Sequence, residues 1–326
     1  MKKPIIQAFD MKQKSRFYLV MLLSIISLTE LTYGQTSVAI TIDDVPNTGK
    51  YEKDHFESKL MHDLDSLNIP ITIFVTEGLI FKGDSIAKNF ELINNWINRS
   101  YTTIGYHSSK HSRYSEVGLD SFKIDVESGE NRVRQLAQKN GKSIDYLRLP
   151  YNDLGKDSVQ HINIEKYLSS KKYTIAPFTV ESADWMFNYM YESYLEKKDM
   201  IKAHEIADNY IAKTIEYFDF FDSLALKIYK RPINQIYLCH DSRLNADYLP
   251  VLINELKKKN YKFISFDEAL QDPVYKQKDN YYKKWGISWV YRWMKNQEEI
   301  SSFTKKEPKD DSYDLYQKLV QEQKKK

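Results

Sequence analysis

The sequence predicts an α/β fold in which parallel strands are joined by helical crossovers. Short runs of β-forming residues alternate with amphipathic stretches between residues 37 and 265, and this alternation is typical of a barrel or of an open doubly wound sheet. The chain has 326 residues, of which 42% are hydrophobic and 14% aromatic, enough for a large packed core. No G-x-G-x-x-G motif follows a predicted strand, and the chain holds only 10 glycines, which argues against a dinucleotide site.

The predicted strands are apolar or β-branched runs bounded by turn residues. They cover residues 37–42, 69–75, 101–106, 146–149, 173–180, 235–239 and 261–265. The predicted helices cover residues 52–67, 86–97, 121–140 and 246–259. In the first helix Phe56, Leu60 and Leu64 lie on one apolar stripe. Ser121 is the expected cap of the third helix, and Gly141 is its expected stop.

Two regions interrupt this alternation. Residues 189–230 form a long charged and aromatic segment between two predicted strands, for which we expect a pair of helices. Beyond residue 275 the chain becomes rich in Tyr, Trp and Lys, and it ends in a polar helix or tail. We therefore expect a sheet domain over residues 36–275, which contains the helical insertion, and an extension over residues 276–326. The aromatic cluster from Tyr281 to Trp293 would either pad the outside of the domain or form a partner surface.

Residues 1–34 have the pattern of an export signal. Lys14 and Arg16 lie in a positive region, residues 17–28 are mostly apolar, and small residues precede a cleavage position after Gly34. The apolar run is short for a transmembrane helix. We therefore expect a periplasmic or secreted protein with no stable membrane span after cleavage, and an uncleaved anchor is the alternative.

Charge and cysteine content argue against a nucleic-acid-binding protein and against a disulfide-stabilised one. The first 34 residues hold five basic and two acidic residues, which leaves 43 basic and 43 acidic residues in the rest of the chain. This balance gives no sign of the clustered basic face that nucleic-acid binding needs. Cys239 is the only cysteine, so no disulfide can form within the chain. The oligomeric state stays open.

Residues with metal-ligating chemistry follow two of the predicted strands. Asp43 and Asp44 end the first strand, and residues 45–49 supply turn chemistry. Neighbouring strand residues point to opposite faces, so the two carboxylates can have different roles at one site only if the chain turns there. His107 and His111 have a spacing that puts both imidazoles on one side of a helical turn. One carboxylate and two imidazoles can hold a zinc-type ion with a position open for water, which predicts a metal hydrolase.

Five short blocks, each at the end of a predicted strand, occur in a characteristic order. They are Thr41-Ile42-Asp43-Asp44, His107-Ser108-Ser109-Lys110-His111, Arg148-Leu149-Pro150-Tyr151, Glu181-Ser182-Ala183-Asp184-Trp185 and Leu238-Cys239-His240. Together the blocks resemble the exported bacterial polysaccharide deacetylases of the NodB-homology type, carbohydrate esterase family 4. The resemblance spans about residues 37–270. It implies a distorted (β/α) barrel, which agrees with the alternation of strands and helices.

By this resemblance, Asp43 would be the general base, and Asp44 would bind a metal together with His107 and His111. A carboxylate bound to a dication is a poor base, because the metal holds its lone pairs and lowers its proton affinity. A neighbouring carboxylate that does not bind the metal is better suited to accept a proton. Imidazole ligands favour zinc or another late divalent ion over magnesium and calcium, so the expected cofactor is a divalent metal, with Zn²⁺ as the first candidate.

The resemblance also implies roles for Arg148 and Tyr151. Arg148 would pair with Asp43 and keep it ionised, and the N–H of Tyr151 would help to stabilise the oxyanion beside the metal. Leu149 stands where the family commonly has a second proline. This change is mild, since Arg148 and the Tyr151 amide remain.

His240 would be the general acid that protonates the leaving amine. The ordinary histidine pKa of about 6.5 suits that step near neutral pH. The family usually supplies an aspartate as the partner of this histidine, and Glu181 stands at that position here. Asp184 and Asp241 are the alternative partners.

Trp185 and Leu238 would wall a small apolar pocket for the acetyl methyl group, and plain core packing is the equal alternative for both. Cys239 precedes His240, but neighbouring strand residues face opposite ways. We therefore expect Cys239 to be a small buried hydrophobe rather than part of a Cys–His dyad.

Together these residues predict an exported metal-dependent deacetylase whose substrate is an acetylated glycan, with an N-acetyl group as the first candidate. The alternatives are an O-acetyl esterase, a catalytically silent carbohydrate-binding protein of the same fold, and a phosphoester hydrolase. The last often uses two metals, whereas ligands for one are found. Peptidoglycan, chitin-like oligomers, xylan and a small glycan all stay open as substrates. The insertion over residues 189–230 would shape or cover the substrate groove, or serve as packing or a dimer contact.

Overall fold

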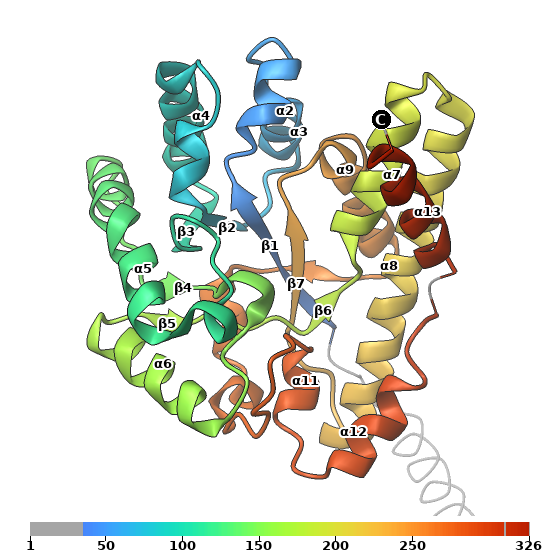
Figure 1. Cartoon of the computed structure of the whole chain (residues 1–326). Helices are drawn as coiled ribbons and strands as arrows, with labels where there is room; N and C mark the ends of the chain where they lie inside the picture. Colours follow the sequence, from blue (N-terminus) through green and yellow to red (C-terminus); the bar gives the residue numbers. More distant parts are fainter. Residues whose placement is uncertain (1–34, 310, 326) are drawn as a thin grey trace, which may run out of the picture. The chain divides into compact units, whose positions relative to one another are not determined.

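A parallel eight-stranded sheet forms the centre of the described chain (Figure 1). The computed structural model describes residues 35–309 and 311–325, and the predicted export signal over residues 1–34 lies outside them. The strands are β1 (Ser37–Val45), β2 (Ile71–Val75), β3 (Thr102–Tyr106), β4 (Tyr146–Leu147), β5 (Thr174–Ile175), β6 (Val180–Glu181), β7 (Gln235–His240) and β8 (Lys262–Phe263). Their order is β5-β4-β3-β2-β1-β7-β6, and β8 pairs with the start of β1.

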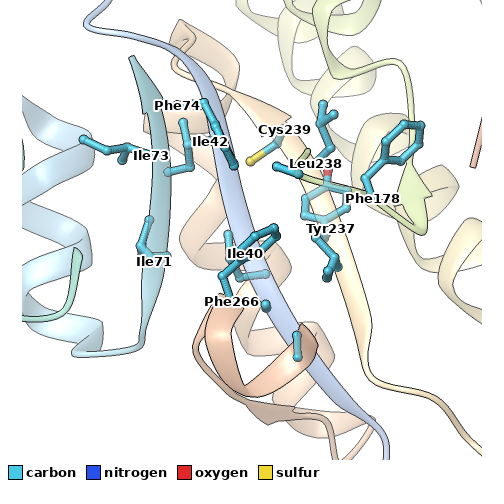
Figure 2. Packing of buried hydrophobic residues seen from close by; sticks show 14 of the residues in the cluster. Ile40, Ile42, Ile71, Ile73, Phe74, Phe178, Tyr237, Leu238, Cys239 and Phe266 are labelled. Atoms are coloured by element: carbon cyan, nitrogen blue, oxygen red, sulfur yellow. The ribbon is translucent and has the colours of Figure 1, made fainter. Parts of the chain in front are cut away.

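The central strand is β1, which pairs with β2 along one edge and with β7 along the other. Both faces of β1 and β2 are buried, as is typical of parallel strands covered by helices. Figure 2 shows Ile40, Ile42 and Ile73 within this core. Cys239 of β7 pairs with Ile42 and is fully buried, whereas His240 pairs with Asp43. The two neighbours therefore face opposite ways, as the sequence predicts.

The sheet is an incomplete barrel, since its end strands β5 and β6 do not pair with each other in the described part of the chain. This arrangement confirms the predicted distorted (β/α) barrel. The predicted strand over residues 173–180 is instead divided between β5 and β6. Pro177 lies between them, and proline has no N–H to donate to a strand ladder.

Helices connect the strands and cover the sheet (Figure 1). They are α2 (Thr48–Lys53), α3 (Lys59–Leu67), α4 (Ile86–Asn98), α5 (Tyr114–Lys139), α6 (Ser158–Ser170), α9 (Arg243–Lys258) and α10 (Phe266–Leu270), with 3-10 turns η1 (Glu77–Phe81) and η2 (Pro150–Asn152). The predicted helix over residues 52–67 is divided into α2 and α3. His55 and Phe56 between them have positive φ, and the Ser58 side chain caps α3.

Two further differences from the predicted helices concern the start of α5 and the presence of α6. α5 begins before the expected cap Ser121 and bends at Gly118, whose φ is 76°. Glycine adopts this left-handed region without a steric penalty. α6 is absent from the predicted elements because its buried face includes the polar His161, so it lacks a clean apolar stripe.

The predicted helix pair of the insertion is present as α7 (Asp184–Glu196) and α8 (Met200–Tyr229), and α13 (Tyr313–Gln323) lies beside α7 (Figure 1). Leu319 of α13 joins α7 and α8 in a second apolar core. Phe218 of α8 belongs to the main core, so the insertion is an integral part of the folded body. No helix in the described ranges is both long enough and apolar enough to cross a membrane.

The C-terminal extension packs on the same body. It contains η3 (Pro273–Lys276), α11 (Trp289–Arg292), α12 (Gln297–Thr304) and α13. Trp289, Val290 and Tyr291 lie in the main core, and Thr36–Lys326 form one compact unit. Most rings of the aromatic cluster therefore pad the sheet domain, but Trp285 is 63% exposed.

Candidate active site

The two carboxylates at the end of β1 diverge because the strand is irregular there. Ile42 pairs with Ile73 and Val45 pairs with Val75, so Asp43 and Asp44 together form a bulge opposite a single residue of β2. Asp44 has a φ of 58°, a left-handed conformation that turns the chain. As a result Asp43 is buried, whereas the Asp44 side chain is 36% exposed. The sequence predicts a turn after Asp44, and the structure turns at Asp44 itself.

Asp44, His107 and His111 form a candidate metal site. Their ligand atoms all lie within 4.8 Å of one another. The Oδ1 atom of Asp44 is 3.5 Å from Nε2 of His111 and 4.0 Å from Nε2 of His107. Ligands at the usual zinc distances in a tetrahedron are about 3.4 Å apart. The two separations from Asp44 lie within about 0.6 Å of this value, so the three groups can converge on a single ion.

The buried partner of His107 sets the tautomer of this ring. Its Nδ1 lies 2.7 Å from the carbonyl oxygen of Arg148. A carbonyl oxygen can only accept a hydrogen bond, so Nδ1 carries the proton and Nε2 keeps the lone pair that a metal needs. Contacts of this kind orient metal-binding histidines in many proteins.

His111 lies on a loop rather than on the expected helical turn, and α5 begins only at Tyr114. The side chain of Asp125 accepts hydrogen bonds from the N–H groups of Ser109, Lys110 and Ser112. These bonds hold the loop open, and they bring the two imidazole centroids to 5.0 Å. The spacing of the two histidines thus correctly predicts that their imidazoles lie close together, although they do so on a loop and not on a helical turn.

Electrostatics favour the protonation states that metal ligands need. Burial raises the pKa of Asp44, but the electrostatic interactions with His107 and His111 and a hydrogen bond from Thr76 outweigh it, so the net shift is downward. Burial and the neighbouring His107 lower the pKa of His111 to about 4. An ionised carboxylate and a neutral imidazole at neutral pH are both ready to bind a cation. Thr76 donates to Asp44 Oδ1 at 3.0 Å. The sequence does not predict this contact, although Thr76 directly follows β2 at the same edge of the sheet.

Asp43 is held by Arg148, as the resemblance implies. Nη1 of Arg148 lies 2.7 Å from Asp43 Oδ1 and 2.7 Å from Thr41 Oγ1, and its Nη2 donates to the carbonyl of Pro177. The guanidinium is fully buried, and it lies over the ring of Phe74. The second Asp43 oxygen, Oδ2, is 3.8 Å from Nε2 of His107 and so borders the metal site.

The carboxylate that contacts His240 is Asp184 rather than the expected Glu181. Asp184 Oδ1 lies 2.7 Å from His240 Nδ1, and Asp184 Oδ2 accepts from the backbone N–H of His240 and from the Asn245 amide. Burial alone lowers the pKa of His240, but the charge and hydrogen bond of Asp184 outweigh it and raise the pKa to about 10. Glu181 Oε1 accepts from the N–H of Ala183 instead.

The backbone explains this difference. Ala183 has a φ of 52°, so the chain turns between β6 and α7 and directs the first residue of α7 back toward β7. Burial and the nearby Asp184 raise the pKa of Glu181 to about 7. The other alternative partner, Asp241, accepts from the N–H of Asn47 and faces α2.

The remaining predicted residues lie around this centre. Tyr151 in η2 has a φ of 60°, and its ring is 4.7 Å from that of His111. Within residues 35–309 and 311–325, the Tyr151 N–H meets no acceptor, whereas the next two N–H groups bond to Leu149 and Pro150. Leu238 is buried in β7, in register with Thr41.

Trp185 is 48% exposed, and its ring packs edge-on against Tyr316 of α13 at 5.5 Å. It therefore lies in the first turn of α7 next to Asp184, where a side chain could line a binding groove. The Trp185 ring contacts the C-terminal helix through Tyr316, so packing is the second role open to this side chain.

Comparison with known proteins finds a family model that matches part of the chain, and it supports the fold. The polysaccharide deacetylase family model matches residues 31–167, and no curated protein matches the chain. Wild-type BA3943 from Bacillus anthracis, a CE4 family pseudoenzyme, is 13% identical with a TM-score of 0.50, over 73% of this chain and 66% of that one. A mutant of BA3943 with restored enzymatic activity is 14% identical with a TM-score of 0.50, over 73% and 69% of the two chains. The Bc1960 peptidoglycan N-acetylglucosamine deacetylase is 18% identical with a TM-score of 0.49, over 73% and 89%.

The two matches to BA3943 support a shared fold and no more. The matched residues 31–167 include the candidate metal ligands, Asp43 and Arg148, whereas His240 lies beyond them. The family match and the metal-site geometry thus concern the same part of the sheet.

Proposed function

We propose that this chain, a member of the polysaccharide deacetylase family by its residues 31–167, is a metal-dependent hydrolase that removes acetyl groups from a saccharide. The observation that carries the proposal is the arrangement of Asp44, His107 and His111 around one point, with Asp43 beside them. Since BA3943 has the same fold and is a pseudoenzyme in its wild-type form, the fold alone does not imply activity. The proposal therefore rests on these side chains.

Asp44, His107 and His111 would hold a divalent metal, and two imidazole ligands favour zinc over magnesium or calcium. Such an ion, when bound, lowers the pKa of water and polarises the acetyl carbonyl group. The ligand atoms have the required lone pairs, because His107 Nδ1 donates to the Arg148 carbonyl and leaves Nε2 as the ligand.

Asp43 would act as the general base. One of its oxygens is held by Arg148 at 2.7 Å, whereas the other borders the metal site. This division orients the carboxylate, because Arg148 fixes one oxygen and leaves the other directed at the metal site. Oδ2 can then accept a proton from the water that attacks the acetyl carbon.

Two other residues would stabilise the tetrahedral oxyanion and protonate the leaving group. The N–H of Tyr151, which meets no acceptor among the described residues, can donate to the oxyanion. His240, kept in its acid form by Asp184, can donate a proton to the leaving nitrogen as the carbon–nitrogen bond breaks. The products would be acetate and a free amine on the sugar. An amine leaves poorly without a proton, so a protonated His240 supports an N-acetyl rather than an O-acetyl substrate.

We further propose an extracytoplasmic location and a glycan substrate, because of the export pattern in residues 1–34 and the family match. Peptidoglycan, chitin-like oligomers and acetylated xylan are the substrates to compare.

The deciding experiment measures acetate release by the mature protein from N-acetylated and O-acetylated glycans, after metal removal and after addition of zinc. We expect zinc-dependent release from an N-acetylated glycan, and loss of release in Asp43→Asn. Release only from O-acetylated glycans would mean that the protein is an O-acetyl esterase and not an N-acetyl deacetylase. Zinc bound at the site without release from any glycan would indicate a carbohydrate-binding protein.

A further inference from the structure

We infer that residues 279–289, here called the C-terminal strap, add a sugar-binding subsite to the active site, with Trp285 as its stacking surface. The inference deepens the proposed function, since it gives a place to the part of the glycan beyond the acetyl group. The family match ends at residue 167, so the strap lies outside the segment that it describes.

The strap is anchored directly on the turn that carries Tyr151. A Cβ atom at Gly286 would lie 2.4 Å from the carbonyl oxygen of Tyr151 and 2.5 Å from the Cβ of Asn152. The two backbones therefore touch at this point. An ion pair of 2.7 Å joins Lys284 of the strap to Glu116 of α5. The segment that carries Trp285 is thus held from both sides.

Further contacts fix the two ends of the strap. Ser288 Oγ donates to the carbonyl of Thr179, and the Trp289 N–H donates to that of Phe178. At the other end the buried Arg292 forms an ion pair with Asp279. A strap tied at both ends loses little conformational freedom when a ligand binds, which favours affinity.

A continuous row of rings and one cation connects Trp285 to the metal site. The His111 and Tyr151 rings are 4.7 Å apart, the Arg113 guanidinium lies 3.9 Å from the Tyr151 ring, and the Trp285 ring is 5.7 Å from the same guanidinium. Each step is shorter than 6 Å. A saccharide with its acetyl group at the metal could therefore reach Trp285 with a sugar unit farther along its chain.

The chemistry of the row suits a sugar. Trp285 is 63% exposed and Tyr151 is 48% exposed, and large exposed aromatic rings often serve recognition rather than packing. A flat indole can stack on the apolar face of a sugar ring. The Arg113 guanidinium beside it offers N–H donors to hydroxyl or acetamido oxygens. Glu116 forms ion pairs with both Lys284 and Arg113 and so offsets part of their positive charge.

The test compares glycan binding by the metal-free mature protein, which prevents turnover. Calorimetry measures the affinity for N-acetylglucosamine oligomers and for acetylated xylo-oligosaccharides, each from a single sugar to a hexamer. The variants are Trp285→Ala and Trp285→Phe. The control is Phe81→Ala, because Phe81 is also exposed and also lies beside an arginine, Arg132, at 4.8 Å.

We expect the gain in affinity from single sugar to hexamer to shrink by about tenfold in Trp285→Ala. Trp285→Phe should keep most of the gain, and Phe81→Ala should leave it as in the wild type. An equal gain in wild type and Trp285→Ala, or no binding of either series by the wild type, would overturn the subsite.

Acetate release, measured in parallel with zinc, separates this inference from the proposed function. Trp285-dependent binding without release would refute the deacetylase and keep the subsite. Release that does not depend on Trp285 at any chain length would keep the deacetylase and refute the subsite.

Discussion

Asp184 Oδ1 lies 2.7 Å from His240 Nδ1, and this contact joins the first turn of α7 to the end of β7. The same carboxylate also accepts from the His240 N–H and from Asn245. The Asp184 carboxylate therefore accepts three hydrogen bonds, two from His240 and one from Asn245. A carboxylate held in this way sets both the orientation and the charge of the imidazole that it faces.

The first prediction concerns the pH dependence of catalysis. Burial alone lowers the pKa of His240, but Asp184 raises it to about 10, so the acid form is present below that pH and is lost above it. Asp184→Asn removes the charge and should move the alkaline limb of kcat/KM to lower pH, with a loss of ~10²-fold in kcat. A bound dication lowers the His240 pKa in both proteins, so the difference between them keeps its sign.

The comparison variant for this experiment is Glu181→Gln. Glu181 accepts a hydrogen bond from the N–H of Ala183 rather than from His240. Its removal should shift the alkaline limb less than Asp184→Asn does. A larger shift in Glu181→Gln would return the role of histidine partner to Glu181.

The second prediction concerns metal affinity. Thr76 donates to Asp44 Oδ1, and contacts of this kind to a metal ligand are worth ~10–100-fold in affinity. Thr76→Val keeps the shape of the side chain and removes the donor, so zinc should bind about tenfold or more weakly in a competition assay with a chelator. Thr72→Val is the matched control, because Thr72 is equally buried in β2. Equal zinc affinity in both variants would refute a role for the Thr76 hydroxyl.

The third prediction concerns stability. Arg148 is fully buried and pairs with the buried Asp43. Arg148→Met leaves an unpaired buried carboxylate, which should lower the free energy of unfolding by about 3–5 kcal/mol. The double variant Asp43→Asn, Arg148→Met should lose less than the sum of the two single variants. Chemical denaturation of the four proteins measures this coupling, and losses that add to within about 0.5 kcal/mol would contradict it.

The sequence predicts that the candidate metal ligands come together, because they lie in two short blocks at strand ends and parallel strands bring those ends together. It predicts Asp43 and Arg148 as partners through a family resemblance, and the structure has them in contact. Asp184 is weighed only as an alternative, since its direction depends on the left-handed conformation of Ala183. Residue spacing carries no information about such a conformation at an alanine, which rarely adopts it.

The same reasoning explains why the sequence does not predict whether the C-terminal extension packs on the sheet domain or forms an exposed surface. The contacts of Gly286 with Tyr151 and of Lys284 with Glu116 join segments more than a hundred residues apart. Periodicity describes neighbours along the chain, so it cannot place such contacts. The aromatic composition of the extension is equally compatible with core packing and with an exposed surface, and the structure uses both, in Trp289 and Trp285.

The fourth prediction tests how closely the strap and the Tyr151 turn depend on each other. Gly286→Ala would place a methyl group 2.4 Å from the carbonyl oxygen of Tyr151, and backbone cannot give way as a flexible side chain can. The strap or the turn must shift, at a cost of about 1–3 kcal/mol in the free energy of unfolding. Because the Tyr151 N–H belongs to the same turn, acetate release should fall as well.

Gly49→Ala is the matched control for this substitution. The nearest side-chain atom to a Cβ at Gly49 is 3.9 Å away, which is ordinary contact, and alanine is favoured over glycine within a helix such as α2. The control should therefore be as stable as the wild type or slightly more stable. If Gly286→Ala were instead as stable as the wild type and kept full acetate release, the strap would be able to move independently of the Tyr151 turn. In that case Trp285 would not have the fixed position that its proposed stacking on a sugar requires.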